Sequence, residues 1–157
     1  MRWSETGAAP CSIARSLSVV GDCWTLLLLR EAFRGTSRFE EFRERLGVAR
    51  NVLAARLRRL AEHGVLERVA ETGGPGRRGH YRLTAKGRDL YPVLLALLRW
   101  GDRWLADERG APMALVHQAC RHQTTPTVTC SHCGKPLEPG QLRARLSAAA
   151  LSGTTQR

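Results

Sequence analysis

The sequence predicts a mostly α-helical fold with one small β-hairpin, followed by a tail of different character. Apolar residues recur at helical spacing through most of residues 12–63 and again after residue 85. Between these stretches, two short alternating segments flank a loop that contains four glycines and a proline. From about residue 113, closely spaced cysteine and histidine replace the helical pattern.

The first two predicted helices are bounded by residues that commonly begin and end helices. Ser12 can cap a helix that runs to Val20, where Gly21 ends it. Asp22 can cap a second helix, CWTLLLLREAF, whose four consecutive leucines imply burial on nearly all sides. Gly35 ends this second helix.

Two further helices are predicted on either side of a tight turn. Ser37 can cap a short helix with the sequence RFEEFRERL. Residues 47–49 form the turn, and the next helix runs from about Arg50 to His63. Gly64 is suited to end it. Two helices joined in this way form a helix-turn-helix.

A hairpin and a last helix complete the predicted fold. Residues 65–69 and 81–83 alternate well enough to be paired strands, with residues 71–80 as the connecting loop. Thr84 can cap a long helix over residues 85–108. This order of helices, hairpin and basic loop predicts a winged helix-turn-helix.

Gly110 and Pro112 mark a boundary after the last helix. We therefore expect three parts: a winged helix-turn-helix domain over residues 11–109, a zinc-knuckle-like Cys/His module over residues 113–140, and a short helix or disordered tail over residues 141–157.

Positive charge is concentrated in the helix-turn-helix and the loop of the hairpin. The chain has a formal net charge of +11, and ten of its 25 Lys and Arg residues fall within residues 50–88, against three of its 14 acidic residues. A basic surplus confined to one part of a chain indicates a polyanionic partner.

The helix from Arg50 combines an apolar face with a polar one. At 100° per residue, Leu53, Leu57 and Leu60 share the face directed at the core. The candidate DNA-contacting residues are Arg50, Asn51, Ala55, Arg58 and Arg59 on the helix, with Arg77, Arg78 and His80 in the loop. Arg56 lies at the border, where it can pair with an acidic residue or reach a flanking phosphate. The alternative is an ordinary solvated helix face.

Other classes of protein fit this sequence less well. No stretch approaches about 18 uninterrupted apolar residues, so no membrane span is expected. The N-terminal residues MRWSETGAAPCS lack the apolar core of a signal peptide, which predicts a cytoplasmic protein. A thiol enzyme would need a cysteine and a histidine oriented toward each other, and the sequence shows no such pair. We therefore do not expect an enzyme.

The run from Cys11 to Trp104 resembles the HxlR-type branch of the MarR-like winged-helix regulators. The matching segments are CSIARSLSVVGDCWTLLLLREAFRG, RFEEFRERLGVARNVLAARLRRLAEHGVLERV and YRLTAKGRDLYPVLLALLRWGDRW. The resemblance implies a homodimer that binds a pseudo-palindromic operator in double-stranded DNA, usually as a repressor of a neighbouring gene. It also implies a dimer interface made by the N-terminal helix and the helix after the wing, where residues 90–105 carry a broad apolar face.

The resemblance also implies a signal that releases the regulator from DNA. MarR-like folds often bind a small-molecule effector, and Trp24, Trp100 and Trp104 could line its pocket or simply belong to the core. Several relatives sense oxidants through a cysteine that matches Cys11. A helix start and a nearby cation would favour its thiolate, although a structural Cys11 is the alternative. Cys23 stands where the family usually has a basic residue.

The tail contains the spacing of a metal site. His117 and Cys120 are separated by two residues, as are Cys130 and Cys133, and nine residues separate the two pairs. Three thiolates and an imidazole suit a structural, tetrahedral Zn²⁺. His122 competes with His117 for the fourth position, and unmetallated thiols are the alternative. A non-specific nucleic-acid-binding protein with a structural zinc module remains the second hypothesis for the whole chain.

Overall fold

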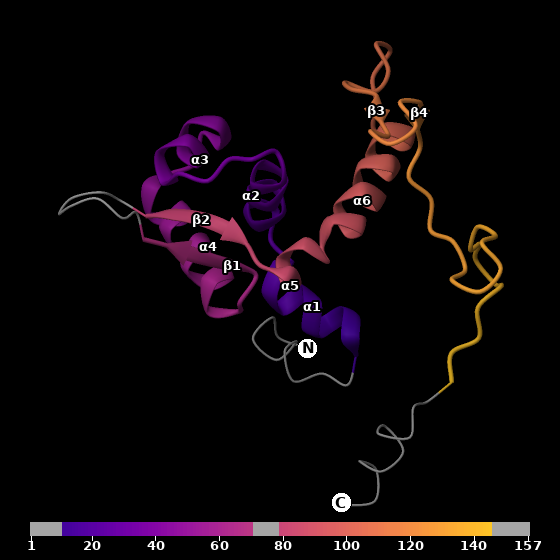
Figure 1. Ribbon diagram of the computed structural model, residues 1–157, viewed down its shortest axis with the longest axis horizontal. Helices are drawn as coiled ribbons and strands as arrows, with labels where there is room; N and C mark the ends of the chain where they lie inside the picture. Colours follow the sequence, from indigo (N-terminus) through magenta and orange to yellow (C-terminus); the bar gives the residue numbers. More distant parts are fainter. Residues whose placement is uncertain (1–10, 71–78, 146–157) are drawn as a thin grey trace, which may run out of the picture. The chain divides into compact units, whose positions relative to one another are not determined.

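The computed structural model describes residues 11–70 and 79–145 (Figure 1). The chain divides into two compact units between Leu98 and Arg99. The elements are α1 (Ser12–Val20), α2 (Cys23–Phe33), α3 (Phe39–Leu46), α4 (Arg50–Glu62), β1 (Leu66–Val69), β2 (His80–Leu83), α5 (Ala85–Arg88), α6 (Tyr91–Trp104), β3 (Leu115–Val116) and β4 (Gln123–Thr124).

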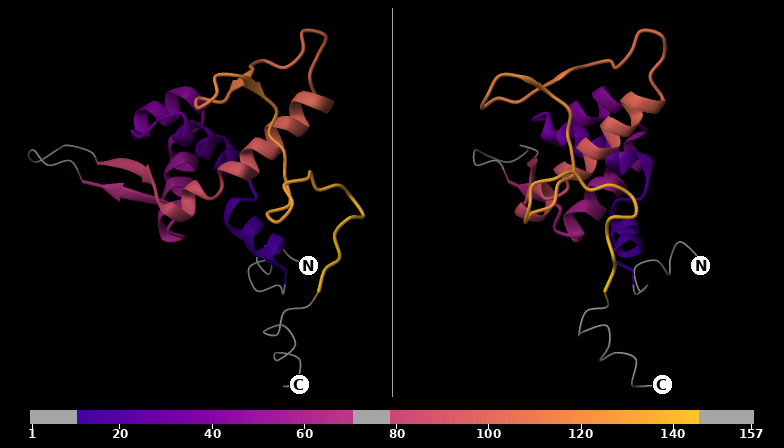
Figure 2. Two further views of the ribbon diagram at one scale, coloured as in Figure 1. Left: turned by 45° about the vertical axis from the view of Figure 1, so that its right-hand side comes forward. Right: turned by 90° about the vertical axis from the view of Figure 1, so that its right-hand side faces the viewer.

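The first unit is a small helical core with a β-hairpin at its side. Helix α2 contacts α3, α4 and β2, and α4 also packs against β1 (Figures 1 and 2). Its largest wholly buried apolar side chains are Phe42, Leu28, Leu29, Leu53, Leu57, Leu60, Leu66 and Val65. The predicted mostly α-helical class with a hairpin wing is confirmed.

The hairpin forms nearly where the sequence predicts it. Strands β1 and β2 are antiparallel, and Leu66 pairs with Leu83 while Val69 pairs with His80. Their ends lie within one residue of the predicted strands. The loop that joins them includes residues 71–78, which lie outside the described residues.

Helix α2 begins with the predicted cap. The Asp22 carboxylate accepts a hydrogen bond from the Thr25 backbone N–H at 3.0 Å, which satisfies one of the free donors at the helix start. For α1 the predicted cap at Ser12 is wrong, because Ser12 is already helical and Cys11 occupies the cap position without a side-chain hydrogen bond.

The predicted cap at Ser37 is also wrong, because α3 begins one residue later with Arg38 at the cap position. Here the carboxylate of Glu41 accepts the backbone N–H groups of Arg38 at 3.1 Å and Ser37 at 3.3 Å. These hydrogen bonds, that of Arg38 first, lower the pKa of Glu41 below its ordinary value. The start of α3 is thus capped by Glu41, inside the helix, and not by Ser37, which precedes it.

The predicted helix from Ala85 to about Glu108 is interrupted. Residues 85–88 form the short helix α5, and α6 starts afresh at Tyr91 and ends at Trp104. Pro92 explains the break, because proline has no N–H and its ring would collide with the carbonyl of Arg88 in a continuous helix. In the first turn of α6 the missing N–H costs nothing.

Among the described residues, no single helix is long and apolar enough to cross a membrane. Only α1 and α2 taken together, bent by 78° at the break between them, reach that length and composition.

Gly87 in α5 allows close approach to the backbone just before β1. A methyl group at this position would overlap the Val65 carbonyl oxygen, which accepts the Thr84 N–H at 3.2 Å. We expect Gly87→Ala to lower the free energy of unfolding by about 1–3 kcal/mol, since the backbone must shift to relieve the overlap. Denaturant unfolding of the two proteins measures the difference.

Gly101 in α6 provides the matched control, because apart from its chain neighbours and the backbone of its own helix no heavy atom lies within 4 Å of a methyl group built there. Gly101→Ala should leave stability unchanged or raise it by up to about 1 kcal/mol through helix propensity. Equal unfolding curves for the two variants would contradict the proposed close contact at Gly87.

Candidate nucleic-acid interface

The turn between α3 and α4 positions the start of α4. Gly47 adopts a left-handed conformation, with φ of 60°, and its N–H donates to the Arg43 carbonyl at 2.9 Å. Val48 is buried and anchors the turn in the core. The chain can therefore turn and begin α4 after only three residues.

Burial of three leucines sets the rotation of α4. Leu53, Leu57 and Leu60 are almost completely buried, as the helical spacing predicts. The residues on the opposite side of the helix are exposed: Asn51, Ala55, Arg58 and Glu62. In residues 11–70 and 79–145, Arg58 has no ion-pair partner, so its guanidinium group is available to an external ligand.

The other arginines of α4 are engaged within the protein. The Arg56 Nε lies 3.0 Å from an Asp22 carboxylate oxygen, and both side chains are partly buried. The sequence left two possibilities for Arg56, a pair with an acidic residue or contact with a flanking phosphate. The structure shows the pair with an acidic residue. The Arg59 guanidinium donates to the Ser18 carbonyl oxygen of α1. Arg59 therefore faces α1 and is less available to DNA than the sequence suggests.

Arg50 lies at the first position of α4 and is held by α3. One of its Nη atoms lies 3.0 Å from the Glu40 carboxylate, and its guanidinium carbon lies 5.2 Å from the centre of the Phe39 ring. The Arg50 side chain is still 56% exposed. It is thus oriented by α3 and remains accessible.

Glu31 is a buried acidic residue that was not identified from the sequence. Its side chain is 3% exposed, and its carboxylate lies 2.8 Å from Arg30, 3.7 Å from Arg45 and 3.8 Å from Arg34. The three guanidinium groups compensate the buried charge and remain about half exposed. They add positive charge to α2 and α3. Glu31 follows the apolar run of α2 in the sequence. An acidic residue in a helix expected to be buried could have predicted this ion pair.

The wing is described only at its base. Arg77 and Arg78 lie outside the described residues. His80 is partly buried at the start of β2, opposite Val69. On the same hairpin, Arg82 pairs with Glu67 across the strands at 2.9 Å.

Helix α6 exposes the apolar face expected from the sequence. None of its residues is buried. Leu94, Leu95 and Leu98 are half-buried, and the exposed fractions of the other large apolar side chains run from 45% at Tyr91 to 63% at Trp104. Val93, Leu97 and Trp100 lie between these values. On α1, Ile13 and Leu17 are exposed as well, at 71% and 42%. Apolar surface of this extent is typical of a partner contact.

The two cysteines of the first unit are both accessible. Cys11 is exposed at the cap position of α1, and Cys23 is exposed at the first residue of α2. The nearby Arg15 guanidinium donates to the Ser12 hydroxyl at 3.3 Å.

In the second unit, the predicted metal ligands are brought together in pairs. The His117 Nδ1 lies 3.3 Å from the Cys120 Sγ. The backbone N–H groups of Cys133 and His132 donate to the Cys130 sulfur and lower the pKa of its thiol. Among the described residues, no three side chains of the metal-binding types gather around one point.

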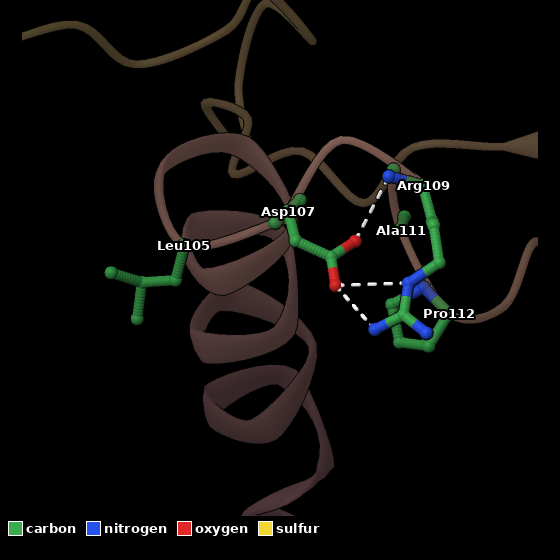
Figure 3. Close-up of a pocket in the computed structure, with 7 residues that line it drawn as sticks. Leu105, Asp107, Arg109, Ala111 and Pro112 are labelled. Atoms are coloured by element: carbon green, nitrogen blue, oxygen red, sulfur yellow. Dashed lines mark hydrogen bonds and ion pairs between the residues drawn. The ribbon is translucent and has the colours of Figure 1, made fainter.

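A hollow in the second unit lies just after α6 (Figure 3). It is lined by Leu105, Ala106, Asp107, Arg109, Gly110, Ala111 and Pro112. Asp107 holds its shape by accepting hydrogen bonds from the Arg109 side chain, at 2.6 and 3.1 Å, and from its backbone N–H, at 2.9 Å. These bonds lower the pKa of Asp107. None of the tryptophans that could line an effector pocket borders this hollow.

Comparison with known families gives a match over most of the first unit and the start of the second. Residues 19–109 match the model of the HxlR-like helix-turn-helix family. An uncharacterised HTH-type transcriptional regulator of Mycobacterium tuberculosis is 43% identical over 126 residues, which are 80% of this chain and 79% of the relative.

Solved structures support the same relationship. PA1607, described as a candidate transcription factor, has 39% sequence identity and a TM-score of 0.82, with 92% of this chain and 99% of that chain covered. The reduced form of the redox regulator HypR has 28% identity and a TM-score of 0.55 over 60% of this chain and 96% of its own; its oxidised form is solved as well. The chain therefore belongs to the family of HxlR-like helix-turn-helix transcriptional regulators.

Proposed function

We propose that this protein is a homodimeric repressor that binds an operator in double-stranded DNA and controls a neighbouring gene. A small-molecule or redox signal releases it. The observation that carries the proposal is the outward face of α4, where Asn51, Ala55 and Arg58 are exposed while the leucines opposite them are buried.

This face has the chemistry that base recognition needs. Asparagine can make two hydrogen bonds to adenine and arginine can make two to guanine in the major groove, while a small alanine permits close approach. Arg50 at the start of the helix is suited to a phosphate on the flanking backbone. Arg77 and Arg78 in the wing, proposed from the sequence alone, would contact the backbone beyond the groove.

The dimer is proposed from the exposed apolar side chains of α1 and α6. Two copies that cover these surfaces would present two α4 helices to successive major grooves on one side of the duplex, about 34 Å apart. Two-fold symmetry of the protein then predicts two-fold symmetry of the operator. The dimer also doubles the phosphate contacts and therefore the dependence of affinity on salt.

Selection of bound sites from random duplex DNA, at two salt concentrations, tests the function directly. We expect a two-fold-symmetric sequence with half-sites about one helical turn apart. Binding without a preferred sequence would instead support the alternative, a non-specific nucleic-acid-binding protein.

Trp100→Glu tests the dimer, because Trp100 lies on the apolar face of α6 and is 56% exposed. A carboxylate buried in an apolar contact should raise the dimer dissociation constant by about tenfold or more. Analytical ultracentrifugation measures this constant. Arg99→Glu, about 100° around the same helix, is the matched control and should leave the dimer intact; equal weakening by both variants, or by neither, would contradict the interface.

Redox release is proposed for the exposed Cys11, in line with the existence of reduced and oxidised forms of HypR. Treatment with diamide should lower operator affinity of the wild-type protein but not that of Cys11→Ser. Cys23→Ser serves as control and should respond as the wild type does. If Cys11→Ser loses affinity on oxidation to the same extent as the wild type, Cys11 is not the sensor.

A further inference from the structure

The second unit contains two hairpins of the same construction. In the first, Leu115–Val116 pairs with Gln123–Thr124. In the second, Thr129 bridges Pro136, and the Leu137 N–H donates to the Val128 carbonyl at 2.9 Å. Each hairpin encloses a loop of six residues, 117–122 in the first and 130–135 in the second.

The two loops are closed by the same backbone hydrogen bond. The N–H of the first loop residue donates to the carbonyl of the sixth: His117 to His122 at 2.9 Å, and Cys130 to Lys135 at 2.8 Å. This correspondence pairs the loops position by position, although their sequences, HQACRH and CSHCGK, share only the fourth residue, cysteine.

The fifth residue of each loop is left-handed. Gly134 has φ of 71° and Arg121 has φ of 60°, and the N–H of each donates to the carbonyl of the first loop residue, at 2.8 and 2.7 Å. Among the described residues, Arg121 is the one residue other than glycine with positive φ. An L-residue with positive φ raises the free energy of the loop. Other interactions of the loop must therefore stabilise this conformation.

The shared geometry places metal-binding side chains at equivalent positions. His117 corresponds to Cys130 at the first position, and Cys120 corresponds to Cys133 at the fourth. His122 corresponds to Lys135, which is not a metal ligand, and its Nδ1 lies 2.6 Å from the Cys120 carbonyl oxygen. The correspondence therefore selects His117 rather than His122 as the fourth ligand.

Residues 111–145 also have no apolar core that could stabilise their fold. From residue 111 to residue 145 no described residue is buried, and only Leu115, Pro126, Cys130 and Leu137 are half-buried. A chain of this size without an apolar core needs another source of stability, such as a bound metal ion.

We propose that the two loops are the halves of one structural zinc site with His117, Cys120, Cys130 and Cys133 as its ligands. Three thiolates and one imidazole complete a tetrahedral shell and leave no open position for catalysis. In the described residues the loops do not meet around one point, so zinc binding closes one on the other. The nine residues between Cys120 and Cys130 can span up to about 30 Å, which permits this closure. The proposal does not depend on DNA binding.

The first test uses the full-length protein, produced without a histidine tag. We expect about one zinc ion per chain by elemental analysis. Without denaturant, Cys11 and Cys23 should react with a thiol reagent while the three tail cysteines are protected. Removal of zinc with a chelator should expose those three. Metal-free protein that binds no added zinc, with all five thiols reactive, would overturn the proposal.

The choice of histidine is tested by His117→Ala and His122→Ala. Competition with a chromophoric zinc chelator should show at least about a tenfold loss of affinity for the first variant and little change for the second. A cobalt-substituted protein gives an independent reading, because loss of a ligand alters its visible spectrum. If His122→Ala loses zinc and His117→Ala keeps it, the correspondence between the loops is wrong. An unchanged melting of the winged unit would show that either variant still folds.

Arg121→Gly and Arg121→Ala separate the strain of the loop from its charge. Both remove the cation, but only glycine adopts positive φ without cost. We expect the glycine variant to hold zinc about fivefold or more tighter than the alanine variant. Equal affinities would show that the loop conformation is not required by the metal.

Discussion

The rotation of α4 about its own axis is the constraint on which the candidate interface depends. Three leucines, at positions 53, 57 and 60, are buried on one side, so the opposite side must face outward. Asp22 reinforces this orientation, because its carboxylate caps α2 and also pairs with Arg56 of α4. Turning α4 would expose the leucines and leave the partly buried arginine and aspartate without each other, which is costly. Apolar packing and one shared carboxylate thus present Arg58 to the solvent.

Much of the fold could be predicted from the sequence because its signals are local. Apolar periodicity located α1 to α4, and the glycine-rich loop located the hairpin. The errors have physical causes that periodicity does not contain. Pro92 breaks the predicted last helix through a clash with the backbone four residues earlier. The Glu41 side chain reaches back to the start of α3 and displaces the cap expected at Ser37.

The sequence predicted which side chains of the candidate site face outward, but not which residues they bond to. Helical spacing identified the exposed Asn51 and Arg58, and it placed Arg56 at the border of the core. It could not show that Arg59 bonds to the Ser18 carbonyl, because the two residues lie far apart in the sequence. In the tail, spacing identified the ligand types, whereas the equivalence of the loops, and with it the choice of His117, needed backbone geometry.

The most direct test of this account is the loss of one base preference when Arg58 is removed. Affinities of the wild type and of Arg58→Ala would be measured for a bound DNA site and for every single base-pair change in it. If Arg58 contacts a base, the variant should bind the site with about 1–3 kcal/mol less binding free energy. It should also lose its base preference at one position in each half-site and keep its preferences at the others. A uniform loss of affinity at all sites would show that Arg58 contacts only phosphate. An unchanged profile would contradict the assignment of α4 as the recognition helix.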